Sequence, residues 1–148
     1  MNSIREKDEQ IKDYVKTHFA FLLDAGFVIN PVKHTGALDQ WELIVSSKTV
    51  WVKFESDRNE ISLYINPKHE DFWISLTAMV YYLTKGKVLP APFEGDLFKD
   101  RDKQYQRLAQ LLQSYWIEIQ QLCTNKTSLS SDEFGEISYK ILDARLKG

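Results

Sequence analysis

Three alternating runs of apolar and polar residues between Asp39 and Ile65 constrain the fold of this chain more than any other feature. A period of two residues places successive side chains on opposite faces of a β-strand, so each run predicts a strand with one apolar face. The short polar segments 46–48 and 57–60 join the runs, which favours an antiparallel meander. The face predicted to lie in the core carries Leu43, Val45, Val50, Val52, Phe54, Ile61, Leu63 and Ile65.

The charged segment Asp57-Arg58-Asn59-Glu60 interrupts the alternation between the last two runs. Asp and Asn favour turns, because their side chains bond nearby backbone groups and tolerate unusual backbone angles. We interpret this segment as a hairpin turn of about four or five residues. A catalytic site would need an acid, a base and a pocket, and the tip of a hairpin has no pocket of its own.

The segments before the meander predict one helix and one further strand. Apolar residues recur with helical spacing over Ile4–Ala25, and Gly26 suits the left-handed position just beyond a helix end. A short strand is expected over Phe27–His34. Pro31 lies within it and lacks a backbone donor, which favours an edge strand or a bend.

Three helices are predicted after the meander. The first is expected from His69 or Asp71 to about Lys85, and the second from Leu97 or Asp102 to Cys123. The third is expected to begin at a capping box formed by Ser130 and Glu133. The segment 88–95 (VLPAPFEG) contains two prolines and is expected to be a loop. Strands are grouped and helices are grouped, so the class is α+β. We expect a single domain over residues 1–148 with an N-terminal helix, a four-stranded antiparallel meander and three C-terminal helices packed on the sheet.

Charge and composition exclude several classes of function. The net charge is -2 and no basic stripe is present, which argues against nucleic-acid binding. The predicted helices mix both signs of charge on their polar faces, which argues against a membrane-surface protein. Cys123 is the one cysteine, and the first residues are charged and lack an apolar leader. We therefore expect a cytoplasmic protein that depends on no disulfide.

The sequence contains no familiar catalytic or cofactor motif. In the segment His69-Glu70-Asp71 a histidine adjoins carboxylates, but adjacent residues at a helix start do not converge on one metal ion. Cys123 lies on an apolar helical stripe, which favours a buried structural thiol over a nucleophile. We predict no catalytic residue, no metal and no cofactor, and we favour a binding protein over an enzyme.

The second face of the predicted sheet mixes aromatic and charged residues. It carries Glu42, Ile44, Trp51, Lys53, Glu55, Ser62 and Tyr64. A fully solvated face rarely carries a tryptophan. Either the C-terminal helices bury this face, or it binds a partner through aromatic anchors inside a charged rim. The residues that would then bind the partner are Trp51, Tyr64, Lys53, Glu42 and Glu55.

Three segments are together similar to small bacterial immunity proteins of toxin–antitoxin and contact-dependent inhibition systems. They are the end of the first helix (FAFLLDAGF), the meander (WELIVSSKTVWVKFESDRNEISLYI) and the segment that follows it (DFWISLTAMVYYL). The similarity is one of architecture and extends over about the first 85 residues. It implies a stoichiometric inhibitor that binds one toxin domain.

Two other kinds of function stay open on the sequence. A small enzyme or ligand-binding domain would have a pocket between the sheet and the long helix. The candidate residues of that pocket are Trp116, Tyr115, His69 and Glu70. A homo-oligomeric adaptor would dimerise through the mixed sheet face or through the long helix.

Overall fold

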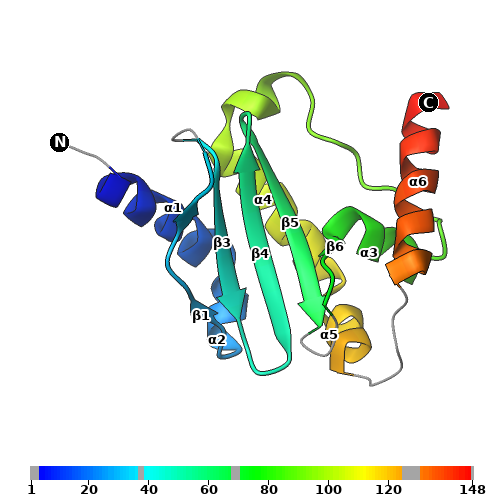
Figure 1. Ribbon diagram of the computed structural model, residues 1–148, viewed down its shortest axis with the longest axis horizontal. Coiled ribbons are helices and arrows are strands. Elements are labelled where there is room, and N and C mark those ends of the chain that lie inside the picture. Colours follow the sequence, from blue (N-terminus) through cyan, green and yellow to red (C-terminus); the bar gives the residue numbers. More distant parts are fainter. Residues whose placement is uncertain (1–3, 37–38, 68–70, 125–130, 148) are drawn as a thin grey trace.

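The computed structural model describes residues 4–36, 39–67, 71–124 and 131–147, and it has the predicted α+β class. The helices are α1 Ile4–His18, α2 Ala20–Asp24, α3 Leu76–Leu83, the 3-10 turn η1 Gly95–Lys99, α4 Arg101–Ser114, α5 Trp116–Thr124 and α6 Ser131–Lys147. The strands are β1 Val28–Ile29, β2 Lys33–His34, β3 Trp41–Ser46, β4 Val50–Asp57, β5 Glu60–Pro67 and β6 Ile74–Ser75. One antiparallel sheet is followed in the sequence by α3, α4, α5 and α6 (Figure 1). None of the helices in these ranges is long and apolar enough to cross a membrane.

The sheet is the predicted antiparallel meander with short additions at both edges. Its strand order is β1-β3-β4-β5-β6, and β2 pairs with the other end of β3. The strand expected around Pro31 is confirmed as an interrupted edge, because β1 and β2 flank the proline and both pair with β3. Asn30 bridges the interruption, since its backbone N–H and its side-chain Nδ2 both donate to the Ile44 carbonyl.

The charged segment between β4 and β5 is a hairpin turn, as predicted. Asp57 pairs with Glu60, so the loop consists of Arg58 and Asn59 alone and is shorter than expected. Their φ angles are 51° and 69°. Positive φ at both central residues is typical of the type I′ turn, whose twist matches that of the flanking strands.

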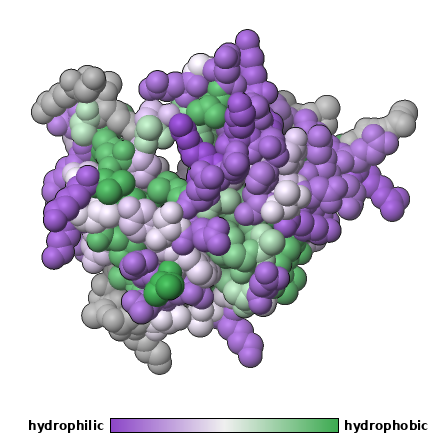
Figure 2. Space-filling model, turned by 180° about the vertical axis from the view of Figure 1, so that it is seen from behind, coloured by the Kyte–Doolittle hydropathy of each residue, from purple (hydrophilic) through white to green (hydrophobic). Residues whose placement is uncertain are grey.

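The core lies between one face of the sheet and the helices behind it (Figure 1). The apolar residues of β3, β4 and β5 alternate as predicted, and each buried side chain faces the helices. Phe54 lies at the centre of this layer. Its ring is 4.7 Å from that of Phe19 and 6.3 Å from that of Tyr105 on α4. Seen from the helical side, the surface over α1 is largely hydrophilic (Figure 2).

Two predicted continuous helices are each broken in the structure. The helix expected over Ile4–Ala25 ends at His18 and resumes as α2, because Phe19 leaves helical geometry at φ -116° and ψ 32° to bury its ring. The helix expected to reach Cys123 breaks at Tyr115, where φ is -116° and ψ is 14°. After that break, Trp116 packs against two phenylalanine rings, Phe21 at 5.9 Å and Phe27 at 5.6 Å.

The helix after the sheet begins later than predicted. Asp71 lies before it, and His69 lies outside the described residues. The N-cap is Ser75, whose hydroxyl accepts a hydrogen bond from the Ala78 N–H at 3.1 Å. The predicted cap is wrong because residues 74–75 first pair with β5 as β6, and this tertiary pairing outweighs the local helical pattern.

The last helix, α6, is present as predicted, while Ser130 of the expected capping box lies outside the described residues. Phe134 of α6 packs against Tyr82 at 5.0 Å and Phe72 at 6.4 Å. α6 therefore lies beside α3, near the β6 edge of the sheet (Figure 1). The prolines of the predicted loop lie in residues 87–94, which have no regular secondary structure.

Candidate interaction surface

The face of the sheet opposite α1, α4 and α5 is the candidate functional site, and we call it the open face. It carries the outward side chains of β3, β4 and β5, namely Glu42, Ile44, Ser46, Trp51, Lys53, Glu55, Ser62 and Tyr64. Strand register makes these residues neighbours, because Glu42 pairs with Glu55 and Lys53 pairs with Tyr64. All five residues predicted to bind a partner therefore lie on one surface. Helices α1, α4 and α5 cover the opposite face of the sheet (Figure 1), and Trp51 is 37% exposed. The interpretation that the C-terminal helices bury the open face is therefore wrong.

Lys53 is the central cation of the open face. Its Nζ lies 4.5 Å from the centroid of the Trp73 ring and 5.3 Å from that of the Tyr64 ring. The same atom is 3.3 Å from Oε2 of Glu55. The Lys53 side chain is only 14% exposed, although it stands on a solvent-facing strand position. Two cation–π contacts and one carboxylate thus hold this ammonium group in a fixed place.

Trp51 and Trp73 form an aromatic pair at one end of the open face. Their ring centroids are 6.2 Å apart with an interplanar angle of 32°. Trp51 is 37% exposed, so this pair presents apolar area to solvent. The sequence pattern does not place Trp73 on this face, because it predicts that residues 71–85 form one helix. The signal that could have found it is the polar Ser75 before an apolar run, which is a typical N-cap.

A hollow of about 440 Å³ lies next to Trp51. It is formed where the chain leaves the sheet at Pro31, and Asn30, Glu42, Ile44 and Ser46 line it. Asn30 is held in place there, because its Nδ2 donates to the Ser46 hydroxyl at 3.2 Å. The interruption of the edge strand therefore gives the open face a recess beside its aromatic pair.

The charges of the open face include an unfavourable pair. Glu42 and Glu55 stand directly opposite each other on neighbouring strands, an arrangement that is usually destabilising. Each has a lysine partner, since Lys33 lies 3.7 Å from Glu42 and Lys53 lies 3.3 Å from Glu55. The pKa of Tyr64 is raised, first by burial and then by the negative charges of Glu55 and Glu60. Tyr64 therefore lies between two carboxylates and the ammonium group of Lys53.

The alternative pocket residues do not form a site together. Trp116 packs into the aromatic core, Tyr115 occupies the break between α4 and α5, and His69 and Glu70 lie outside the described residues. A cavity does lie between β5 and α4, with other residues lining it. Within the described ranges, no group of three or more His, Cys, Asp or Glu side chains could hold a metal ion.

Each histidine within the described ranges contacts a carboxylate on a different helix or strand. His18 of α1 contacts Asp102 of α4 at 2.8 Å, and His34 of β2 contacts Asp8 of α1 at 2.7 Å. Both pairs attach α1 to its neighbours. We assign both histidine–carboxylate pairs a structural role, which is to hold α1 in position.

The Cys123 thiol should resist alkylation in the native protein. The residue is buried on α5, and burial raises the pKa of its thiol to about 12. At mildly alkaline pH the thiol therefore stays protonated, and the thiolate is the reactive species. We expect iodoacetamide to label the denatured chain fully while the native chain is hardly labelled, as measured by intact mass. Rapid labelling of the native protein would contradict this burial.

Comparisons with protein-family models, with curated proteins and with solved structures found no match to this chain.

Proposed function

We propose that this protein is a non-enzymatic binding module that holds another protein against its open face. The observation that carries the proposal is the partly exposed Trp51–Trp73 pair beside the fixed ammonium group of Lys53. Tryptophan and tyrosine dominate the energetics of protein interfaces, because a large rigid ring buries much area at little entropic cost. A rigid sheet keeps these side chains in place before the partner arrives, which lowers the cost of binding.

The charges of the open face favour a partner with a basic group. Glu42 and Glu55 are adjacent carboxylates whose lysine partners lie to either side. An arginine or lysine from the partner, placed between them, would relieve their repulsion. The acidic side chains of Asp57 and Glu60 at the hairpin end extend this negative region. Such complementarity raises the association rate and makes it dependent on salt.

A bacterial toxin domain is the partner that we favour. The opening helical segment with α1 and α2, the β3–β5 meander and residues 71–83 with β6 and α3 carry the similarity to small immunity proteins that the sequence suggests. On this proposal the protein is a stoichiometric inhibitor that covers part of its toxin. A cytoplasmic location belongs to the same proposal, because Cys123 is a free buried thiol.

Replacing Trp51 with alanine is the direct test. We expect the free energy of unfolding to fall by only about 1 kcal/mol, the value of one partly exposed aromatic pair. Partner binding should weaken at least about tenfold, because truncation of a central aromatic anchor removes a hot spot. Urea denaturation measures the first quantity. Pull-down from the native host, followed by titration with the purified partner, measures the second.

Ile117→Ala is the matched control, because Ile117 is 67% exposed and lies on α5, away from the open face. It should retain the partner in full. A partner that binds Trp51→Ala as tightly as the wild type would overturn the proposal. Light scattering of the purified proteins tests the homo-oligomeric adaptor alternative. If the wild type is a dimer and Trp51→Ala is a monomer, the open face binds a second copy of the chain.

A further inference from the structure

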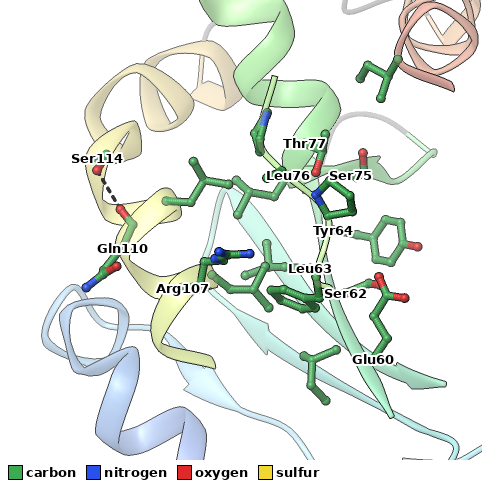
Figure 3. A pocket seen from close by; sticks show the side chains of 18 of the residues that line it. Glu60, Ser62, Leu63, Tyr64, Ser75, Leu76, Thr77, Arg107, Gln110 and Ser114 are labelled. Carbon is green, nitrogen blue, oxygen red and sulfur yellow. Dashed lines mark hydrogen bonds between the residues drawn. The ribbon is translucent and has the colours of Figure 1, made fainter. Parts of the chain in front are cut away.

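A cavity of about 590 Å³ lies between β5 and α4, apart from the aromatic end of the open face. We call it the β5–α4 cavity. Its walls come from β5, the start of α3, the loop at residues 90–93, one side of α4 and one side of α6 (Figure 3). The volume lies within the usual range for pockets that bind small molecules. Five segments distant in sequence form it, so it is a product of the whole fold.

The walls of the cavity combine an apolar part with polar side chains at Ser62, Ser75, Thr77 and Gln110. Leu63, Leu76, Leu108, Leu111 and Ile141 line it. The loop adds Phe93, whose ring is buried. Pro90 and Pro92 also line the cavity, and prolines stiffen a loop because their φ angle is fixed. The apolar part of the cavity wall is therefore in place before any ligand arrives.

Arg107 is the cation of this cavity. Figure 3 shows its side chain extending from α4 toward Ser62 and Leu63, and Glu60 at the start of β5 is the carboxylate that lines the same cavity. Its guanidinium carbon is 5.8 Å from the centroid of the Phe93 ring. Within the described ranges, no carboxylate forms an ion pair with Arg107. A guanidinium group offers a planar pair of donors that matches a carboxylate.

We propose that the β5–α4 cavity binds an amphipathic carboxylate, with its charged group on Arg107 and its apolar body against the leucine side chains. Charge complementarity selects an anion, and the apolar walls select a hydrocarbon body over a polar one. Two sources share this chemistry, a free aliphatic acid and the C-terminal carboxylate of an apolar peptide. The cavity shares Ser62 and Tyr64 with the open face but is not lined by Trp51 or Trp73, so substitutions at Trp51 and at Arg107 test the two proposals independently.

Calorimetric titration with decanoate and with decanol tests the charged contact. We expect decanoate to bind at one site per chain and roughly tenfold or more tighter than decanol, because a charge-assisted hydrogen bond distinguishes the two. Octanoate should bind about tenfold more weakly than decanoate, since it buries two fewer methylene groups. Failure of decanoate to bind, or equal binding of decanoate and decanol, would overturn the proposal.

Arg107→Gln should remove the preference for decanoate over decanol while leaving the fold unchanged, because Arg107 is exposed. Lys103→Gln is the matched control, since Lys103 is an exposed cation of the same helix that does not line the cavity. Ser138→Trp should block both probes, because Ser138 is an exposed residue of α6 at the cavity wall. Unchanged decanoate binding by Arg107→Gln or by Ser138→Trp would refute the assignment.

A short peptide that ends in two leucines, with a free or an amidated C-terminus, distinguishes the two sources. Tighter binding of the free peptide than of decanoate identifies a peptide terminus as the ligand, and the reverse order identifies an aliphatic acid. Trp51→Ala should bind decanoate as the wild type does, because Trp51 does not line this cavity. Loss of decanoate binding in that variant would contradict a separate site.

Discussion

Gln104→Ala is expected to lower the free energy of unfolding by about 3 kcal/mol, through lost hydrogen bonds and a small cavity. Gln104 lies on α4 with no exposed surface. Its Oε1 accepts the Ile61 N–H at 2.8 Å, and its Nε2 donates to the carbonyl oxygens of Asn59 at 2.8 Å and Leu97 at 2.6 Å. One amide thus connects the β4–β5 hairpin, η1 and α4. Its removal leaves the Ile61 N–H buried without a partner, which is the most costly part of the change.

Chemical denaturation measures the loss, and amide hydrogen exchange locates it. The Ile61 amide should lose protection more than the amides of β3, because the damage is local to the hairpin. Gln106→Ala is the control, since Gln106 is an exposed residue of the same helix. That change should stay within about 0.5 kcal/mol of the wild type, as surface substitutions usually do. Equal effects of the two substitutions would show that the buried amide contributes nothing.

Phe54→Ala is expected to cost about 4 kcal/mol, which is the usual range for deletion of a buried phenylalanine side chain. The Phe54 ring is fully buried between the sheet and the helices. It meets Phe19 edge to face at 78°, and Tyr105 lies on its other side. Deletion opens a cavity at the contact of β4 with both α1–α2 and α4, where the surrounding rings have little freedom to collapse.

The midpoint of urea denaturation should fall strongly in Phe54→Ala and much less in Phe54→Leu, which refills most of the space. Tyr139→Ala deletes an aromatic side chain that is 76% exposed on α6, and its unfolding free energy should hardly change. A loss in Phe54→Ala no larger than the loss in Tyr139→Ala would contradict the central place of this ring in the core.

Local pattern was enough to predict the meander. The alternation from Leu43 to Ile65 determined which side chains enter the core, and the turn residues Arg58 and Asn59 marked the hairpin. The same alternation placed Trp51 and Tyr64 together on the second face. Period and turn chemistry are properties of short segments, so a sequence displays them directly.

Contacts between distant segments could not be predicted in this way. Phe19 breaks the first helix because Phe54, far along the chain, offers it a buried ring contact. Ser75 becomes a cap because residues 74–75 first pair with β5, which also places Trp73 beside Trp51. Gln104 resembles a solvated polar residue of a helix in the sequence. Its burial depends on backbone groups of two other segments, the β4–β5 hairpin and η1.

The interruption of the sheet edge at Pro31 affects how this protein can associate. An unbroken exposed strand presents a row of free N–H and carbonyl groups that can template the growth of a sheet from chain to chain. Here β1 and β2 are each two residues long, and Asn30 occupies the gap between them. At the opposite edge, β6 is equally short and Gln104 takes up the Ile61 N–H. Both edge additions are thus too short to template a long strand pairing, and association through the described part of the sheet should depend more on the side chains of the open face than on its edges.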